Sequence, residues 1–349
     1  MSTWERVAEL PVEIDGYSLE GLVQPVSSDF ERKSTVIGLW GGGQEGTGED
    51  VTYDAVDHDV LQAAGPTLPL AGAYTLAEFC EHLAGLDLFP EEPQRDVSRR
   101  YRTWAFESAA LDLALCQAEI ALHDALGREP RPVTFVVSLR LGEPPTLEPI
   151  ERRRAVCPQL AFKLDPTSSW DEDLIAALVE TGAVDSVDFK GYYQGTVVDQ
   201  PPDPVLYERV VTAFPEAWIE DPALTPETDA VLAEHRERFS WDAPIHSVAD
   251  IEELPYPPRM VNIKPSRLGG LRNLLDAYDY CAERGIGNYG GGQFELGVGR
   301  GQNQYLASLF HPDAPNDVAP SGFNLPEPEP GLPCSPLQVA AHEVGFRWG

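Results

Sequence analysis

From Pro132 onward the chain repeats a short apolar segment, a turn and a segment with helical spacing. The predicted strands are 133–139, 159–164, 186–189, 217–219, 239–241, 260–263, 286–290 and 317–319. Strands that alternate with helices build a parallel sheet with right-handed crossovers, and eight of them in succession favour a closed barrel. A doubly wound open sheet ranks second, because no Gly-x-Gly-x-x-Gly follows a first strand.

The part of the chain before Pro132 has a different pattern of predicted strands and helices. Residues 1–95 alternate short strand-like runs with turns, and a helix is predicted over 99–126 with a stop at Gly127. The glycine-rich run 41–51 lacks the Gly-Lys-Ser/Thr ending of a phosphate loop, and its three acids would repel phosphate. We interpret this run either as a flexible loop over a site or as a long hairpin turn.

Charge and cysteine content narrow the class of protein. The chain has 57 acidic and 25 basic residues, a formal net charge of −32, which argues against binding a nucleic-acid backbone. We expect a soluble, cytoplasmic protein without membrane contact, because no apolar run approaches about 18 residues and residues 1–10 do not resemble a signal peptide. The five cysteines lie far apart without a Cys-x-x-Cys pair, which predicts buried thiols rather than disulfides or a zinc site.

Lysine is rare, and its positions are informative. The chain has four lysines, Lys33, Lys163, Lys190 and Lys264. Lys264 ends the strand-like run 261–264 just before a glycine-marked helix start, so it is expected at the carboxyl end of a strand, where α/β barrels carry their chemistry. A chain that takes most of its positive charge from arginine and still has lysine there suggests an amine that can lose its proton.

Six predicted strands end at, or lead into, an ionisable residue. In chain order these residues are Lys163, Asp188, Glu220, Asp242, Lys264 and Glu295. Each one alone fits a helix cap or a turn, but the ordered set favours a site. Three carboxylates on successive strands suit Mg²⁺, which prefers oxygen ligands. Two lysines beside such a metal would face a bound carboxylate, and one amine would remove its α-proton to give an enediolate.

Several segments carry a family resemblance. Ile-Lys-Pro-Ser-Arg-Leu-Gly-Gly at 263–270 resembles the sixth-strand lysine motif of the enolase superfamily, and Trp-Ile-Glu-Asp-Pro at 218–222 resembles its fourth-strand metal motif. Residues 293–300 are similar to its seventh-strand segment, and 109–115 to the helix that joins its capping domain to its barrel. The resemblance is greatest to the muconate-lactonizing subgroup, which includes o-succinylbenzoate synthases and N-succinylamino acid racemases.

The resemblance implies an α/β fold, a modified TIM barrel (β/α)7β with an α+β capping domain. The expected domains are the capping domain over 1–128, the barrel over 129–325 and a segment, 326–349, that returns to the capping domain. Implied roles are Mg²⁺ binding by Asp188, Glu220 and Asp242, and acid–base chemistry by Lys163 and Lys264. Candidate substrate contacts are Lys190, Glu295, Tyr53 and Trp40. A small-molecule carboxylate substrate and a homo-oligomer are also expected.

The sequence departs from the family pattern on three strands. The second strand usually reads Lys-x-Lys. Here Lys163 is either the second lysine, our preferred interpretation, or the first, with Asp165 in place of the base. On the third strand Lys190 replaces an asparagine, where it would neutralise the metal site, contact a substrate carboxylate, act as a third amine or extend over the rim. On the fifth strand Ala243 replaces an acid beside Asp242.

The predicted activity is that of a Mg²⁺-dependent lyase or isomerase that abstracts an α-proton. The outcome would be racemisation or epimerisation, or β-elimination as in o-succinylbenzoate synthesis, because one lysine pair supports both. The alternatives are a muconate-type cycloisomerase and a barrel that binds a carboxylate without turning it over.

Overall fold

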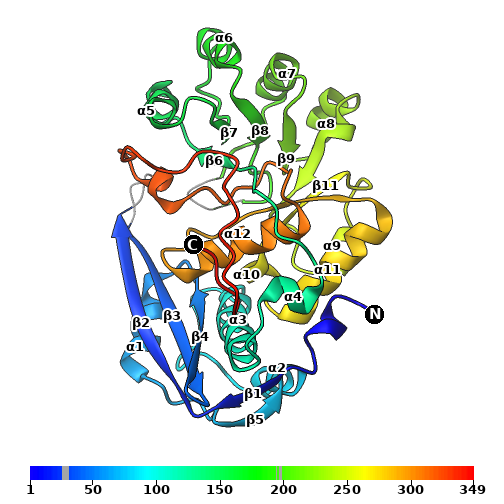
Figure 1. The fold of residues 1–349 in the computed structure, drawn as a ribbon. Coiled ribbons are helices and arrows are strands. Elements are labelled where there is room, and N and C mark those ends of the chain that lie inside the picture. Colours follow the sequence, from blue (N-terminus) through cyan, green and yellow to red (C-terminus); the bar gives the residue numbers. More distant parts are fainter. Residues whose placement is uncertain (26–30, 194, 196–198) are drawn as a thin grey trace.

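The computed structural model describes residues 1–25, 31–193, 195 and 199–349 (Figure 1). Within these ranges seven short parallel strands form one curled sheet, in the order in which they occur in the chain. They are β6 (Val136–Leu139), β7 (Ala161–Leu164), β8 (Val184–Asp188), β9 (Trp218–Glu220), β10 (Phe239–Trp241), β11 (Met260–Ile263) and β12 (Gly287–Gly290). The predicted α/β class with a barrel-like parallel sheet and a separate cap is confirmed.

The predicted eighth strand, 317–319, is reduced to isolated bridges. Phe135 pairs with Asn316, and Gly291 pairs with Asp317, both in parallel. The buried Asn316 side chain accepts from the Gly290 N–H at 2.6 Å and donates to the Thr134 carbonyl at 2.9 Å. One side chain therefore satisfies backbone groups on both edges of the sheet, which closes the barrel without a regular strand.

Helices follow most of the barrel strands. They are α5 (Glu148–Val156), α6 (Glu172–Thr181), α7 (Pro204–Ala213), α8 (Pro226–Leu232), α9 (Val248–Glu252), α10 (Pro265–Leu268), α11 (Leu271–Arg284) and α12 (Val298–Phe310), with 3-10 turns η2 (Arg236–Arg238) and η3 (Ser321–Asn324). Side chains of Asp171, Asp203, Thr225 and Ser247 accept backbone N–H groups at helix starts. Such caps fix where each helix leaves its strand–helix turn.

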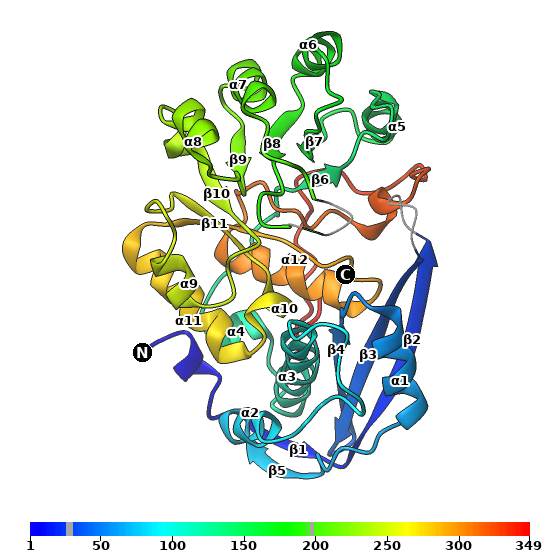
Figure 2. The same cartoon turned by 180° about the vertical axis from the view of Figure 1, so that it is seen from behind.

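The capping region precedes the barrel in the chain and lies beneath it in Figure 1. It contains η1 (Trp4–Arg6), a β1 (Pro11–Ile14) and β5 (Gly72–Thr75) pair, and an antiparallel sheet of β2 (Gly16–Pro25), β3 (Glu31–Gly41) and β4 (Gln44–Asp50). Its helices are α1 (Ala55–Ala64), α2 (Leu76–Ala84), α3 (Ser98–Gln117) and α4 (Leu122–Leu126). Figure 2 shows α10 of the barrel next to α3.

Two expectations for the capping region need correction. The helix predicted over 99–126 is broken between α3 and α4, where Glu119 has a left-handed φ of 56°. The glycine-rich run is a tight turn followed by β4, so the hairpin interpretation holds and the flexible-loop interpretation is wrong. A Cβ at Gly46 or Gly48 would come within 2.1 Å of the α3 backbone, so these glycines serve close packing.

The C-terminal segment runs from the barrel to the capping region (red in Figure 1). Phe346 packs edge-on against Trp104 of α3, with ring centroids 6.4 Å apart. The carboxylate of Asp112, also on α3 and fully buried, accepts from the Phe346 N–H at 2.7 Å and from Arg347 Nε at 3.2 Å. These contacts bind the end of the chain to the helix that precedes the barrel.

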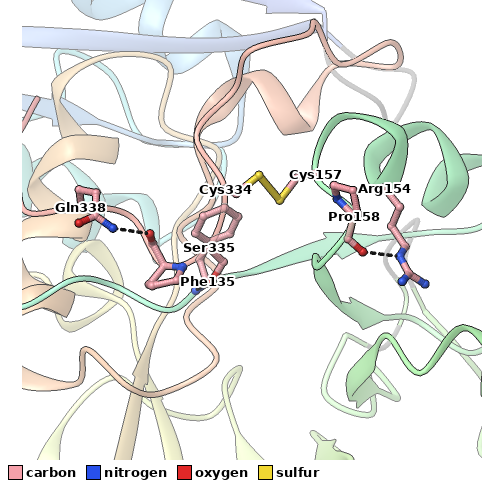
Figure 3. The surroundings of a disulfide bond; sticks show 8 residues. Phe135, Arg154, Cys157, Pro158, Cys334, Ser335 and Gln338 are labelled. Atoms are coloured by element: carbon pink, nitrogen blue, oxygen red, sulfur yellow. Dashed lines mark hydrogen bonds between the residues drawn. A yellow bond between two sulfur atoms is a disulfide. The ribbon is translucent and has the colours of Figure 1, made fainter.

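A disulfide joins the same segment to the barrel. Cys157, which follows α5, is bonded to Cys334, with the two Cα atoms 5.7 Å apart (Figure 3). The prediction of thiols is wrong for this pair. The two residues are 177 positions apart in the chain, so their spacing gave no signal. Cys80, Cys116 and Cys281 are free thiols.

Two buried charged side chains hold the capping sheet against the loop after β12. Glu49 of β4 accepts from the N–H groups of Leu296 at 2.7 Å and of Gly297 and Gly299 at 2.9 Å. The Arg32 guanidinium donates to carbonyl oxygens of both regions, at 2.6 Å to Thr52 and 2.9 Å to Gln293. Because these bonds cross between cap and barrel, the two parts are expected to unfold together.

Glu49→Ala should therefore lower the free energy of unfolding by about 2–4 kcal/mol, because it leaves buried N–H groups without an acceptor. Urea denaturation measures this change. The control is Glu20→Ala on the exposed side of β2, which should stay within about 0.5 kcal/mol of the unaltered protein. Equal stability of the two variants would contradict the interpretation.

Glu107 of α3 makes stability depend on pH. Its buried carboxylate accepts from the Leu271 N–H at 2.6 Å, and burial raises its pKa from 4.5 to about 7. The folded protein thus holds this proton at pH values where the unfolded chain has lost it. The resulting stabilisation is complete below pH 4.5 and disappears as the pH rises through about 7.

Glu107→Gln should remove this dependence. Between pH 4.5 and about 7 the unaltered protein is expected to lose up to about 3 kcal/mol of stability relative to the variant, since one pKa unit corresponds to about 1.4 kcal/mol. Denaturation of both proteins at several pH values in this range gives the difference. A difference that does not change with pH would show that Glu107 does not titrate there.

Candidate metal and catalytic site

Three buried carboxylates meet where neighbouring strands end. Asp188 ends β8, Glu220 ends β9 and Asp242 follows β10. Asp188 and Glu220 are register partners, so their side chains point to the same side of the sheet. Each residue offers an oxygen within 4.8 Å of the others. We call Asp188, Glu220 and Asp242 the carboxylate triad.

Asp242 is held from two sides. Its Oδ1 accepts from Arg267 Nη1 at 2.6 Å and its Oδ2 from Lys264 Nζ at 2.8 Å. Burial would raise the pKa of Asp242, but these two cations outweigh it and hold the pKa below its usual range. The Asp221 carboxylate accepts from the backbone N–H of Asp242 at 2.9 Å and of Ala243 at 2.8 Å, and so fixes the turn after β10.

Lys163 of β7 lies on one flank of the triad. Its Nζ is 2.7 Å from Glu220 Oε1, 3.7 Å from Asp188 Oδ2 and 3.4 Å from Asp317 Oδ2. Burial alone would lower the pKa of Lys163, but these carboxylates outweigh it and raise the pKa well above 10.5. Lys163 therefore holds its proton firmly in this arrangement.

Lys264, after β11, lies on the other flank. It is buried, and its ammonium group bonds to the Asp242 carboxylate. Burial lowers the pKa of Lys264, and the nearby charges of Arg267 and Lys163 lower it further, against the opposing effect of Asp242. Of the two flanking amines, Lys264 is thus the one that loses a proton more easily.

Lys190 points inward rather than over the rim. It has a left-handed φ of 54°, and its N–H donates to Asp188 Oδ1 at 3.0 Å. Its Nζ is 2.5 Å from Asp188 Oδ2 and 3.6 Å from Asp165 Oδ1. Asp165, which follows β7, also accepts from Arg140 Nε at 3.1 Å. Lys163 and Asp165 are both buried at the site, so both registers considered for the second strand remain open.

The other three predicted substrate contacts, Glu295, Tyr53 and Trp40, do not all lie together in the structure. Glu295 is buried and accepts from the Gln293 N–H at 2.6 Å, and Arg300 Nη2 is 3.1 Å from it. Tyr53 is 37% exposed and lies 4.8 Å from the Arg32 guanidinium, near the loop after β12. Trp40 does not lie near the triad. Arg32, at the start of β3, bonds to the loop after β12, whereas Trp40 lies about 26 Å further along the same strand, near its other end.

Sequence reasoning missed several contacts of the triad. Tyr289 of β12 donates its hydroxyl to Glu220, and Tyr193 donates to Asp242 Oδ2 at 3.4 Å. Asp317 was predicted only as part of a strand, yet its carboxylate pairs with Lys163. Arg267, which donates to the Asp242 carboxylate, lies within the lysine motif at 263–270, and this position was the one sequence signal that could have indicated the contact.

The donor set of the triad fits a hard divalent cation. Three carboxylate residues offer oxygen ligands from neighbouring strands, and water or substrate oxygens would complete an octahedral Mg²⁺ shell. The same carboxylates bond to ammonium groups, so a metal would compete with lysine for them.

Comparison with solved structures identifies the fold. Muconate lactonizing enzyme from Pseudomonas putida matches with a TM-score of 0.67 at 18% identity, covering 96% of each chain. A member of the enolase superfamily from Listeria innocua gives a TM-score of 0.65 at 19% identity, covering 91% of this chain and 88% of that chain. The fold is that of the enolase superfamily, which confirms the resemblance seen in the sequence motifs.

Within this fold, the chain belongs to the family described as domain of unknown function (DUF8230). The model of its N-terminal domain matches residues 5–125, and that of its C-terminal domain matches residues 129–325. Among the described residues no helix is long and apolar enough to cross a membrane.

Curated relatives match over part of their length. N-succinylamino acid racemase of Amycolatopsis sp is 36% identical over 102 residues, which cover 25% of this chain and 28% of the relative. The o-succinylbenzoate synthase of Bacillus subtilis is 43% identical over 63 residues, covering 18% and 17%. That of Listeria innocua is 26% identical over 187 residues, covering 53% and 43%. The chain thus spans less than half the length of these relatives.

Proposed function

We propose that this protein is a Mg²⁺-dependent lyase or isomerase that abstracts the α-proton of a small-molecule carboxylate. The observation that carries the proposal is the pair of buried amines, Lys163 and Lys264, on either flank of the carboxylate triad. The names of the matched relatives, a racemase and two o-succinylbenzoate synthases, support the same reaction class.

Asp188, Glu220 and Asp242 would hold the metal, and bound Mg²⁺ would supply the positive charge that stabilises an enediolate. The Lys264 Nζ, whose pKa is lowered, would take the α-proton as general base. The Lys163 Nζ, whose pKa is raised, would keep its proton and deliver it from the opposite side. Delivery to the same carbon gives racemisation or epimerisation, and departure of a β-substituent gives elimination.

Substrate recognition belongs to the same proposal. Lys190, Glu295 and Tyr53 remain candidate contacts, and Trp40 is withdrawn because of its distance from the triad. The division into 1–128, 129–325 and 326–349 is also proposed, supported by the ranges of the two family models. A homo-oligomer remains a prediction.

Proton exchange in D₂O, followed by NMR, tests the function with Mg²⁺ and a panel of N-succinylamino acids and succinylbenzoate precursors. The unaltered protein should exchange an α-proton, and Lys163→Ala and Lys264→Ala should each slow product formation at least about 100-fold. Chelation of the metal should abolish exchange. The matched control is Lys33→Ala, which removes a lysine paired with Asp59 on the capping region.

The products separate the outcomes. Inversion at the exchanged carbon indicates racemisation, and loss of water indicates elimination. Lactone opening or closure would indicate the muconate-type cycloisomerase. Metal-dependent binding of a panel member without exchange would favour the non-catalytic barrel and contradict the proposed activity.

A further inference from the structure

Salt bridges around the triad involve ten side chains, which we call the site network. Seven of them form one cluster, and Lys264, Arg267 and Asp242 form a second cluster that meets the first at the triad. Its cations are Lys163, Lys190, Lys264, Arg140 and Arg267, and its carboxylates are Asp165, Asp188, Glu220, Asp242 and Asp317. Within the described residues, five cations thus meet five carboxylates, and the formal charge of the network is zero before metal or substrate binds.

Other charged side chains near the site network change its net charge little. Glu295 and Arg300 form a separate pair whose charges cancel. Asp221 accepts backbone N–H groups, and as a single carboxyl group it adds at most one negative charge. A divalent cation would therefore leave the buried site with at least one uncompensated positive charge. Such a charge in a site of low dielectric is costly unless a counter-charge arrives with it.

Lys190 is the one lysine of the network that has no role in the proposed proton transfers. Three of the four lysines of the chain are in this network, and two of them are assigned to acid–base roles. Lys190 holds Asp188 through both its backbone N–H and its Nζ. Because Lys163 is 3.7 Å from the same carboxylate, Asp188 lies between two ammonium groups.

A carboxylate shared by two ammonium groups is a weaker ligand for a dication, since the cation must displace or face their charges. Lys190 has limited exposure, 13% of its side chain, so water screens its charge poorly. The Asp165 oxygen on its other side is 3.6 Å away, which is too long for a hydrogen bond. When a metal takes Asp188, Lys190 keeps only this longer ion pair with Asp165, which Asp165 also shares with Arg140, so part of the Lys190 charge is available to an incoming anion.

We propose that Lys190 makes metal binding depend on an anionic ligand: Mg²⁺ binds weakly to the protein alone and tightly together with a dianion such as a dicarboxylate. The proposal rests on the metal site of the proposed function. It adds that Mg²⁺ binding and anion binding are coupled, and that Lys190 causes the coupling. The two negative charges of the dianion offset the two positive charges of the metal. By thermodynamic linkage, each ligand must tighten the other by the same factor.

Calorimetric titration of Mg²⁺ at constant ionic strength tests the coupling. The probe is succinate, with butyrate as the monoanionic comparison. For the unaltered protein, saturating succinate should lower the Kd of Mg²⁺ at least about tenfold, and butyrate should lower it less. Titration of succinate with and without Mg²⁺ should give the same factor. A Kd of Mg²⁺ that succinate does not change would overturn the coupling.

Lys190→Met tests the residue and needs no anion. Methionine has similar length and no charge, so Mg²⁺ should bind the variant at least about tenfold more tightly than the unaltered protein, with less effect of succinate. Lys190→Arg keeps the charge and should keep the weak affinity. Lys33→Met, which removes a lysine paired with Asp59, is the matched control and should behave as the unaltered protein.

The results separate this inference from the proposed function. Unchanged or weaker Mg²⁺ binding by a folded Lys190→Met variant overturns the inference, even where the unaltered protein exchanges α-protons. Tighter binding by that variant supports it, even where no panel substrate is turned over. Thermal unfolding of the variant establishes that it is folded.

Discussion

The burial of the carboxylate triad is the constraint on which the site depends. Moving a carboxylate out of water costs several kcal/mol unless a partner compensates its charge. Glu220 and Asp242 each have a lysine within 2.8 Å, and Asp188 has two lysines within 3.7 Å. This demand explains why a chain with 57 acidic residues and few lysines places most of its lysines at one end of one sheet.

Buried polar side chains also need partners in the capping region, where those partners are backbone groups of the barrel. Glu49 and Arg32 are buried and bond to main-chain groups of the loop that follows β12, and the buried Glu107 accepts from the first N–H of α11. A buried polar side chain that pairs with backbone groups across a contact holds the two surfaces in one relative position, because a shift of either surface leaves polar groups unpaired. The capping region is thereby held against the loop that follows β12.

Much of the fold and the triad could be predicted from the sequence because both follow local rules. Strand–helix alternation gave the parallel sheet, and ionisable residues at strand ends gave Asp188, Glu220 and Asp242. The contacts of Tyr289 and Asp317 depend on which strands become neighbours when the sheet curls, and no local pattern carries that information. The same holds for the Cys157–Cys334 disulfide and for Trp40, whose distance from the site depends on how β3 is oriented.

The opposite pKa shifts of the two flanking lysines follow from the charges around each buried amine. Lys264 has one carboxylate partner, Asp242, which it shares with Arg267. Lys163 has three carboxylates around it, and one of them, Asp317, comes from the two-residue bridge that replaces a regular eighth strand. The bridge pairs Asp317 with Gly291, and its carboxylate lies 3.4 Å from the Lys163 amine. Asp317 thus adds to the negative charge that Glu220 and Asp188 place around Lys163, which supports the proposed roles of Lys163 as acid and Lys264 as base.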